Sequence, residues 1–248
     1  MWTDTRSLQP GDAFLALSGE NHDAHRFLGE AAKAGAAVLI VNRSRAAEIP
    51  DGPAVIVVDD TRAAFGSLAA RYRAEFELPV VAVGGSNGKT STKELIAAVL
   101  GALGPVVASE ASFNNDVGVP ATLLRVDEAT RVAVVEVGTN HPGELAPLVR
   151  MARPRVGVIT SLGREHLEFF GDLDGVAREE GALAEGLAPD GCLIVHGDSP
   201  GIDPVVARSA ARGVRCGLGS GNDWCAERTA TDDSGSEFAV WAPQREFH

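Results

Sequence analysis

Short apolar runs alternate with longer polar or alanine-rich stretches along most of this 248-residue chain. In its first part the apolar runs lie at 13–17, 36–41 and 54–58, and helical patterns lie at roughly 25–34 and 61–76. Apolar runs of strand length that alternate with helical stretches are typical of an α/β unit. We therefore predict a small N-terminal α/β domain over residues 1–78, with a boundary near Glu77, Leu78 and Pro79.

From Val80 onward the alternation becomes a regular strand–helix–strand rhythm. Strands are predicted near 80–83, 106–108, 132–137, 156–160 and 192–196, with helical stretches between most of them. Strands as continuously apolar as 132–135 indicate a mainly parallel sheet covered by helices on both faces. We therefore expect a second α/β domain over residues 79–248, of the phosphate-loop type.

The pattern weakens after about Cys216. The glycine-rich stretch 217–223 indicates a loop, and one more strand is expected at 238–241. The sheet is therefore expected to be incomplete at its C-terminal end.

Residues 85–90 (Gly-Ser-Asn-Gly-Lys-Thr) are the most informative stretch, between an apolar run over 78–83 and a helical pattern over 92–100. A buried strand, a glycine-bearing turn and a helix start are the setting of a phosphate-binding loop. Glycines let the backbone approach an anion, while N–H groups and the helix dipole supply positive charge. In such a loop Lys89 reaches the outer phosphates, and the Thr90 hydroxyl binds Mg2+.

The match is to the shorter G-x-x-G-K-T form, because the longer pattern requires glycine at the position of Val83. The alternative is a strand-to-helix turn with glycines for packing and an exposed lysine. The lysine and threonine in this setting favour nucleotide phosphate binding. The candidate nucleotide-binding residues are Gly85, Ser86, Asn87, Gly88, Lys89, Thr90 and Ser91.

The charge balance argues against nucleic acid and anionic membrane surfaces as partners. The net charge is −12 and the pI is near 4.9, whereas those partners need a basic surface.

No stretch approaches the roughly eighteen uninterrupted apolar residues of a spanning helix, and no secretion signal opens the chain. Cys192, Cys216 and Cys225 form no CxxC pair, which favours reduced thiols in a cytoplasmic protein.

Further motifs follow one another along the chain up to about residue 200. They occupy residues 4–6 with 10–14, then 19–27, 85–90, 113–120, 136–144 and 163–168. Together they resemble the Mur ligase family. The segments 113–120 (Phe-Asn-Asn-Asp-Val-Gly-Val-Pro) and 136–144 (Glu-Val-Gly-Thr-Asn-His-Pro-Gly-Glu) are more similar to the members that add D-alanyl-D-alanine than to the sibling ligases.

The resemblance implies that ATP phosphorylates the terminal carboxylate of a UDP-N-acetylmuramoyl-tripeptide, and that the amine of D-alanyl-D-alanine attacks the acyl phosphate. This step requires neutralised phosphate charge and an aligned carboxylate, which a phosphate loop, a lysine and Mg2+ supply. The implied catalytic residues are Lys89, Glu136 and His166. Thr90 and Glu136, at a strand end, are the expected ligands of one Mg2+, and His166 serves a second. The alternatives are a surface carboxylate for Glu136 and a structural histidine for His166.

Four residues match substrate-binding positions of the family. Thr5 and Arg6 match a motif of the uridine-binding domain, and Asn114 and Asn115 match positions next to the peptide-bearing substrate. Such side chains contact diphosphates and base edges, but they also stabilise turns. Both readings stay open for Thr5, and binding is favoured for Arg6 and Asn115. His22 and His25 are interpreted as loop residues rather than metal ligands.

The chain departs from the family pattern at Glu180 and Ala182. The family has a lysine at the first position, carbamylated to bind the second Mg2+, and a glutamate at the other. Because a carbamylated lysine is a carboxylate on a long stem, we hypothesise that Glu180 replaces it as a metal ligand. The alternative is a solvated helix face that Glu180 shares with Glu179.

Length is the second departure. The family continues with a segment that helps hold adenine and a C-terminal domain that binds the dipeptide. We therefore expect a monomer with a trimmed start, a UDP-substrate domain and most of an ATPase domain, unable to complete ligation alone. Other readings are a sibling ligase that adds a diamino acid, a folylpolyglutamate synthase, and a nucleotide-binding module without catalysis.

Overall fold

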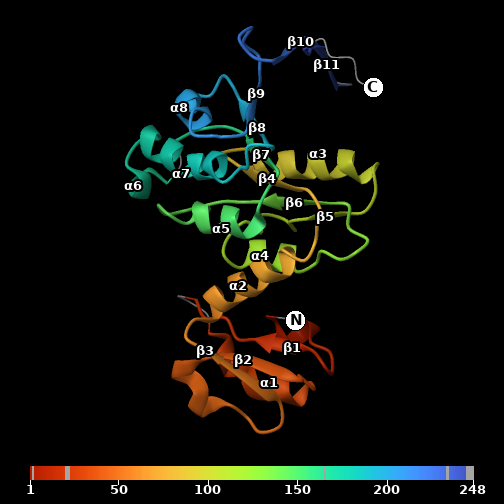
Figure 1. Cartoon of the computed structure of the whole chain (residues 1–248), viewed down its shortest axis with the longest axis vertical. Helices are drawn as coiled ribbons and strands as arrows, with labels where there is room; N and C mark the ends of the chain where they lie inside the picture. Colours follow the sequence, from red (N-terminus) through yellow and green to blue (C-terminus); the bar gives the residue numbers. More distant parts are fainter. Residues whose placement is uncertain (2, 20–22, 165, 233–234, 244–248) are drawn as a thin grey trace. The chain divides into compact units, whose positions relative to one another are not determined.

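In the computed structural model the chain forms two compact units, Met1–Ala69 and Ala70–His248 (Figure 1). The structure describes residues 1, 3–19, 23–164, 166–232 and 235–243. His22 and Glu165, which belong to two of the quoted motifs, lie outside the described residues. The division falls inside helix α2 (Thr61–Arg73), ahead of the boundary predicted near Glu77.

The first unit is built on a three-stranded parallel sheet with the order β1-β2-β3. Its strands occupy the three predicted apolar runs: β1 (Ala13–Leu15), β2 (Val38–Asn42) and β3 (Ala54–Val58). The 3-10 helix η1 (Thr5–Ser7) precedes β1. The 3-10 helix η2 (Ala24–Phe27) and the short helix α1 (Leu28–Lys33) connect β1 to β2, and the 3-10 helix η3 (Arg43–Glu48) connects β2 to β3. Phe14, Leu28, Leu39 and Val41 form the centre of the core, so the predicted small α/β unit is confirmed.

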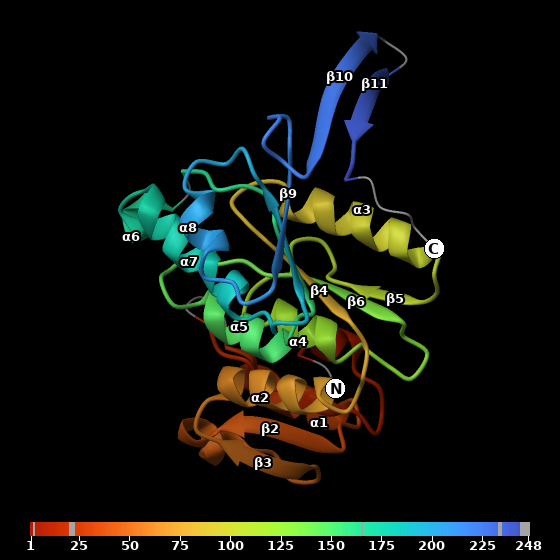
Figure 2. The same cartoon turned by 45° about the horizontal axis from the view of Figure 1, so that its top comes forward.

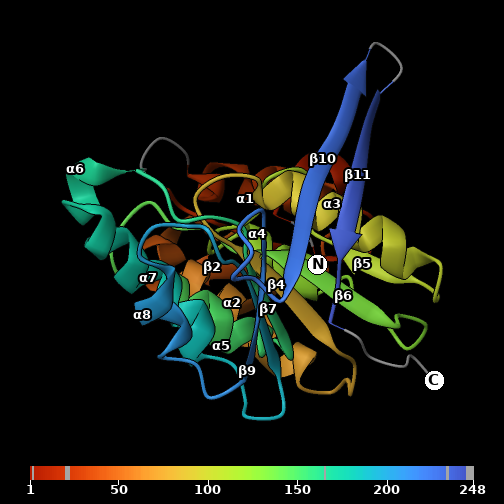
Figure 3. The same cartoon turned by 90° about the horizontal axis from the view of Figure 1, so that it is seen from above.

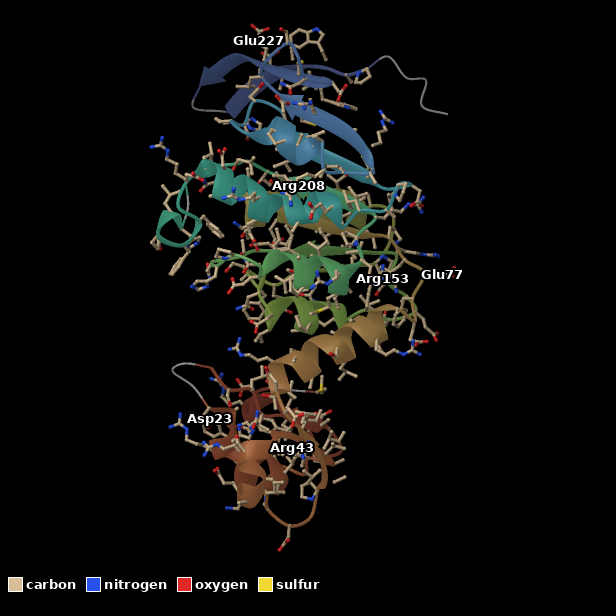
Figure 4. All side chains as sticks on the ribbon, turned by 60° about the vertical axis from the view of Figure 1, so that its left-hand side comes forward. Asp23, Arg43, Glu77, Arg153, Arg208 and Glu227 are labelled. Atoms are coloured by element: carbon tan, nitrogen blue, oxygen red, sulfur yellow. The ribbon has the colours of Figure 1, made fainter. Side chains whose placement is uncertain are left out.

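His25 is fully buried in this unit and makes hydrogen bonds through both ring nitrogens. Its Nε2 accepts the backbone N–H of Asn42 at 2.9 Å, and its Nδ1 lies 2.7 Å from Asp23 Oδ1. Because Nε2 accepts, we assign the ring proton to Nδ1, which donates to Asp23. Asp23, labelled in Figure 4, also pairs with Arg45. Both ring nitrogens of His25 are therefore occupied by hydrogen bonds within the first unit.

The second unit contains an eight-stranded sheet with the order β11-β10-β9-β8-β7-β4-β6-β5. Its neighbours pair in parallel except β10 with β11, which is antiparallel. Five strands lie where they were predicted: β4 (Val80–Gly84), β5 (Val106–Ala108), β6 (Val132–Glu136), β7 (Val156–Ile159) and β8 (Cys192–His196). The predicted, mainly parallel sheet is confirmed.

The last strands are β9 (Arg212–Gly217), β10 (Trp224–Asp232) and β11 (Gly235–Trp241). The strand expected at 238–241 is the second half of β11, and the loop expected at 217–223 joins β9 to β10. The hairpin of β10 and β11 projects from the sheet (Figure 2). Strands β9 and β10 were not predicted, because arginine, glycine and threonine interrupt their apolar positions.

Helices cover both faces of this sheet (Figure 3). Helix α3 (Lys89–Gly101) packs Ile96 and Leu100 against Val81, Val83 and Val134 on one face. The other face carries α4 (Gly118–Leu123), α5 (Leu145–Ala152), α7 (Leu173–Glu185) and α8 (Ile202–Val206), with the short α6 (Leu167–Phe170) beside α7.

Arg208, labelled in Figure 4, ties the segment after α8 to α7. It donates to the carbonyls of Ala177 and Arg178 and pairs with Glu185. No helix among the described residues is both long and apolar enough to cross a bilayer.

Asp23 makes the first unit sensitive to acid. Burial alone would raise the pKa of Asp23, but hydrogen bonds from Arg45, His25 and Ser18 outweigh it and hold that pKa well below its ordinary value. A lowered folded-state pKa stabilises the fold above the ordinary carboxyl pKa of about 3.9. This stabilisation is lost as the pH falls through the folded-state value.

We predict that Asp23→Asn lowers hydrogen-exchange protection of β2 at pH 7 by about tenfold, because it removes a charged hydrogen-bond acceptor. The difference from the wild type should shrink as the pH falls below about 4. Asp59→Asn is the control, since Asp59 is 84% exposed and pairs with Arg43 at the surface. Equal protection in wild type and Asp23→Asn at pH 7 would contradict the prediction.

Candidate nucleotide site

The carboxyl ends of β4, β6 and β7 bring the predicted residues to one edge of the sheet. Val83 of β4 is in register with Glu136 of β6, and Gly84 is in register with Ile159 of β7. The loop over 85–90 follows β4, and the segment over 160–166 follows β7. Ligands of open parallel sheets bind at this edge, which makes it the candidate site.

Gly85 has a backbone that other residues adopt only with strain. Its φ is +107°, and a Cβ at this position would lie 2.6 Å from Thr160 Oγ1 and 2.8 Å from the Thr160 nitrogen. Gly88, with φ of +87°, precedes α3 in a left-handed conformation. The two glycines therefore shape the turn from β4 into α3.

The first three N–H groups of the loop donate to protein acceptors. Gly85 donates to Glu180 Oε2 at 2.7 Å. Ser86 donates to the Ser161 carbonyl at 2.9 Å, and Asn87 donates to Ser161 Oγ at 3.1 Å. These bonds hold the loop against α7 and the segment after β7, so the N–H groups that an anion can approach begin at Gly88 and the first turn of α3.

Lys89 opens that first turn of α3 and lies half-buried. Its Nζ donates to the Gly85 carbonyl at 2.6 Å and to the Ser86 carbonyl at 3.1 Å. The ammonium group therefore lies over the loop that it belongs to. Thr90 is half-buried and Ser91 is exposed in the same turn. A cation, a hydroxyl and helix N–H groups thus occur together, as phosphate binding requires.

Glu136 is 1% exposed, so the alternative of a surface carboxylate is wrong. Its Oε1 accepts a hydrogen bond from Asn114 Nδ2 at 2.9 Å. Its Oε2 is the buried side-chain atom among the described residues that has no hydrogen-bond partner. A buried carboxylate oxygen without a donor is costly, and a cation would stabilise it. Together with the Thr90 hydroxyl, this oxygen is the kind of hard donor that Mg2+ prefers, so the residues fit that ion.

Asn114 and Asn115 differ in their contacts. Asn114 donates to Glu136, and its carbonyl accepts the N–H of Gly138 at 2.9 Å. The Oδ1 of Asn115 accepts the N–H groups of Val117 and Gly118, at 3.1 and 2.9 Å. Asn115 therefore closes the turn before α4, whereas Asn114 binds Oε1 of Glu136, the carboxylate oxygen next to the candidate metal oxygen.

Glu180 lies at the base of the phosphate loop and is 1% exposed. Its neighbour Glu179 accepts the N–H groups of Gly143 and Leu145, at 2.8 Å each. The alternative of a solvated face is therefore wrong, since both carboxylates bind backbone N–H groups. Replacement of the family lysine by Glu180 as a metal ligand stays a prediction.

His166 precedes α6 in a left-handed conformation with φ of +46°. Its carbonyl accepts the N–H groups of Phe169 and Phe170. Among the described residues, no three His, Cys, Asp or Glu side chains gather as a metal site, so Glu136, His166 and Glu180 do not form one cluster. The role of His166 in metal binding also stays a prediction.

Thr5 and Arg6 belong to the first unit. Thr5 Oγ1 donates to Glu30 at 2.9 Å, while the Arg6 side chain is 86% exposed and pairs with Asp4. The hydrogen bond from Arg6 to Asp4 and the charge of Asp4 raise the pKa of Arg6.

Sequence reasoning assigned no role to two serines that hold the site together, Ser109 and Ser161. Ser161 accepts the loop N–H groups, and the Ser109 hydroxyl accepts the N–H of Glu136 at 3.0 Å. Both come directly after predicted strands, at 106–108 and 156–160. That position is the signal that could have found them.

The model of the Mur ligase middle domain matches residues 83–248. The chain belongs to the Mur ligase family. A relative in Escherichia coli, UDP-N-acetylmuramoyl-tripeptide–D-alanyl-D-alanine ligase, is 44% identical over 79% of this chain and 43% of its own length. This Mur ligase chain thus spans about half the length of the curated relatives it matches.

Two solved structures are similar to this Mur ligase chain. A crystal structure of MurF from Acinetobacter baumannii has a TM-score of 0.85 and 34% identity, over 96% of this chain and 54% of that one. MurF from Thermotoga maritima in complex with ADP has a TM-score of 0.87 and 25% identity, over 97% of this chain and 55% of that one. Both TM-scores indicate the same overall fold.

We predict that Gly85→Ala destabilises the second unit of this Mur ligase by about 1–3 kcal/mol, because alanine is strained at this φ and meets Thr160. The measurement is urea unfolding followed by tryptophan fluorescence in a Trp2→Phe background, where Trp224 and Trp241 report on that unit. Gly101→Ala is the matched control in an open position of α3 and should not destabilise. Equal midpoints for Gly85→Ala and the wild type would contradict the prediction.

A pair of substitutions separates the two roles of Glu180. If Glu180 serves as an acceptor for the Gly85 N–H, Glu180→Gln keeps an acceptor and loses little stability, while Glu180→Ala loses about 1–3 kcal/mol. If Glu180 is a metal ligand, both variants weaken the Mg2+ dependence of nucleotide affinity to a similar extent. Unfolding and nucleotide titration, each with and without Mg2+, distinguish these outcomes.

Proposed function

We propose that this Mur ligase chain takes part in ATP-dependent joining of D-alanyl-D-alanine to UDP-N-acetylmuramoyl-tripeptide through an acyl phosphate. The observation that carries the proposal is the unpartnered, buried Oε2 of Glu136 at the same sheet edge as the Lys89 loop. The names of the relatives support the substrates, and the ADP complex of the Thermotoga maritima protein supports the nucleotide.

In this proposal the loop from Gly85 to Ser91 surrounds the phosphates of ATP, the N–H groups at the start of α3 hold them, and Lys89 neutralises their charge. Thr90 and Glu136 hold Mg2+, which, when bound, stabilises the charge of the transferred phosphoryl group. Asn114 orients the Glu136 carboxylate through its hydrogen bond to Oε1. The carboxylate of the tripeptide then lies in line with the terminal phosphate, which is the alignment that the reaction requires.

The proposal assigns the UDP precursor to the first unit, through Thr5 and Arg6, and ATP to the second. It includes Asn115 beside the peptide and His166 at a second Mg2+. It places the reaction in the cytoplasm and has the chain act as a monomer.

One observation favours a second candidate, a nucleotide-binding module without catalysis. Glu180 stands where the family has a lysine, and one of its oxygens accepts the Gly85 N–H. Acyl-phosphate formation from UDP-N-acetylmuramoyl-tripeptide and ATP by a full-length version would exclude this candidate. Tight Mg-ATP binding without acyl-phosphate formation by a full-length version would favour it.

The first experiment is calorimetric titration of the chain with a non-hydrolysable Mg-ATP analogue. We expect binding to the wild type and a loss of at least about thirtyfold in affinity for Lys89→Ala, because a cation that contacts phosphate is removed. Lys33→Ala is the control, since Lys33 is an exposed lysine of the first unit. A folded wild-type chain that binds neither this analogue nor the UDP precursor would contradict the proposed function.

A further inference from the structure

Lys93 lies one helical turn after Lys89 in α3, and its side chain is completely buried. Its Nζ donates to the carbonyls of Ser109 and Ala111, at 2.7 and 2.8 Å. It also forms an ion pair with Glu94 Oε1 at 2.6 Å, although the Glu94 side chain is 63% exposed. Lys93 therefore reaches from the phosphate-loop helix to the chain that follows β5.

The segment over 109–115, which Lys93 contacts through two carbonyls, also contacts Glu136. The Ser109 hydroxyl accepts the N–H of Glu136 at 3.0 Å, and the Ser109 N–H donates to the Val134 carbonyl at 3.0 Å. Five residues after Ser109, Asn114 donates to Glu136 and accepts from Gly138. Both the backbone and the carboxylate of Glu136 are thus fixed by the segment that Lys93 binds.

Two features of this contact cost free energy. Burial of an ammonium group costs free energy unless its charge is paired and its donors are satisfied, and an apolar side chain in its place would avoid that cost. Ala111, one of the two carbonyl acceptors, has a φ of +45°, which is strained for a residue with a Cβ. The contact therefore holds the segment in a conformation that it does not adopt by preference.

We propose that Lys93 is a positioning residue that fixes Asn114 and Glu136 relative to the phosphate-loop helix. Lys93 acts through Ser109 and the segment over 109–115, and it does not contact substrate. This inference rests on the proposed function, because the proposed function assigns Glu136 and the Lys89 loop to one site. It adds the physical connection between Glu136, the candidate metal ligand, and the loop of Lys89 that binds phosphate in the proposed function.

Hydrogen exchange of the whole chain by NMR, without nucleotide or metal, tests the connection directly. In Lys93→Met, which keeps the length of the apolar stem, we expect protection of the Glu136 and Gly138 amides to fall by about tenfold or more. The amides of Val137 and Thr160, which donate to the carbonyls of Val83 and Gly84, should change less than about twofold. The matched control is Lys33→Met, which should change none of these amides.

Nucleotide affinity supplies a second readout that general destabilisation would not reproduce. In Lys93→Met the affinity for the ATP analogue without Mg2+ should stay within about twofold of the wild type, because the loop contacts of Gly85, Ser86 and Asn87 remain. The gain in affinity on adding Mg2+ should fall by about fivefold or more. Glu94→Gln should behave like the wild type, because both carbonyl contacts of Lys93 remain.

Unchanged protection of Glu136 and Gly138 in a folded Lys93→Met chain overturns the proposal, and so does an equal loss of protection at all four amides. If Lys93→Met does not fold, the same exchange measurement is made on Lys93→Gln. The glutamine amide can donate to one of the two carbonyls and carries no charge. Loss of protection confined to Glu136 and Gly138 in that variant supports the proposal, and unchanged or uniform protection overturns it. If Lys89→Ala binds nucleotide like the wild type, the proposed function fails, while the exchange result still decides whether Lys93 positions Glu136.

Discussion

The candidate site depends on the pairing of β4 with β6 on one side and with β7 on the other. This pairing puts Glu136 beside Val83 and Ile159 beside Gly84, immediately before the phosphate loop. Successive side chains of a strand point to opposite faces, so a slip of one residue would turn Glu136 away from its present neighbours. The register of three buried strands therefore sets the geometry of the site before any loop contact is made.

Two equally buried carboxylates, Glu136 and Glu180, have different surroundings. Glu180 accepts the Gly85 N–H and so stabilises the turn that leads into α3. Glu136 receives a hydrogen bond at Oε1 and leaves Oε2 without a donor. One oxygen of Glu180 is thus committed to the loop, whereas Oε2 of Glu136 retains the capacity to bind a cation. Burial alone does not distinguish these roles, but the inventory of donors around each oxygen does.

The sequence was sufficient for the features that depend on continuous apolar strands and on local glycine chemistry. The five strands from Val80 to His196, the turn at Gly85 and the location of Glu136 at a strand end were all predictable, since each depends on local pattern. Strands β9 and β10 were missed because arginine, glycine and threonine interrupt their apolar positions. The contacts of Glu180 and Lys93 could not be predicted, because each joins the loop or its helix to a segment whose position only the folded sheet determines.

The strand order also governs how the second unit assembles. Strand β4 is the first of its sheet to be synthesised, yet it pairs with residues 133–136 and 156–159. Such non-local parallel pairing requires the closure of long loops and is slow compared with helix or hairpin formation. On the ribosome β4 therefore emerges with both hydrogen-bonding edges open until its partners follow. During that interval this apolar strand is the segment at which chaperone binding and aggregation compete with folding.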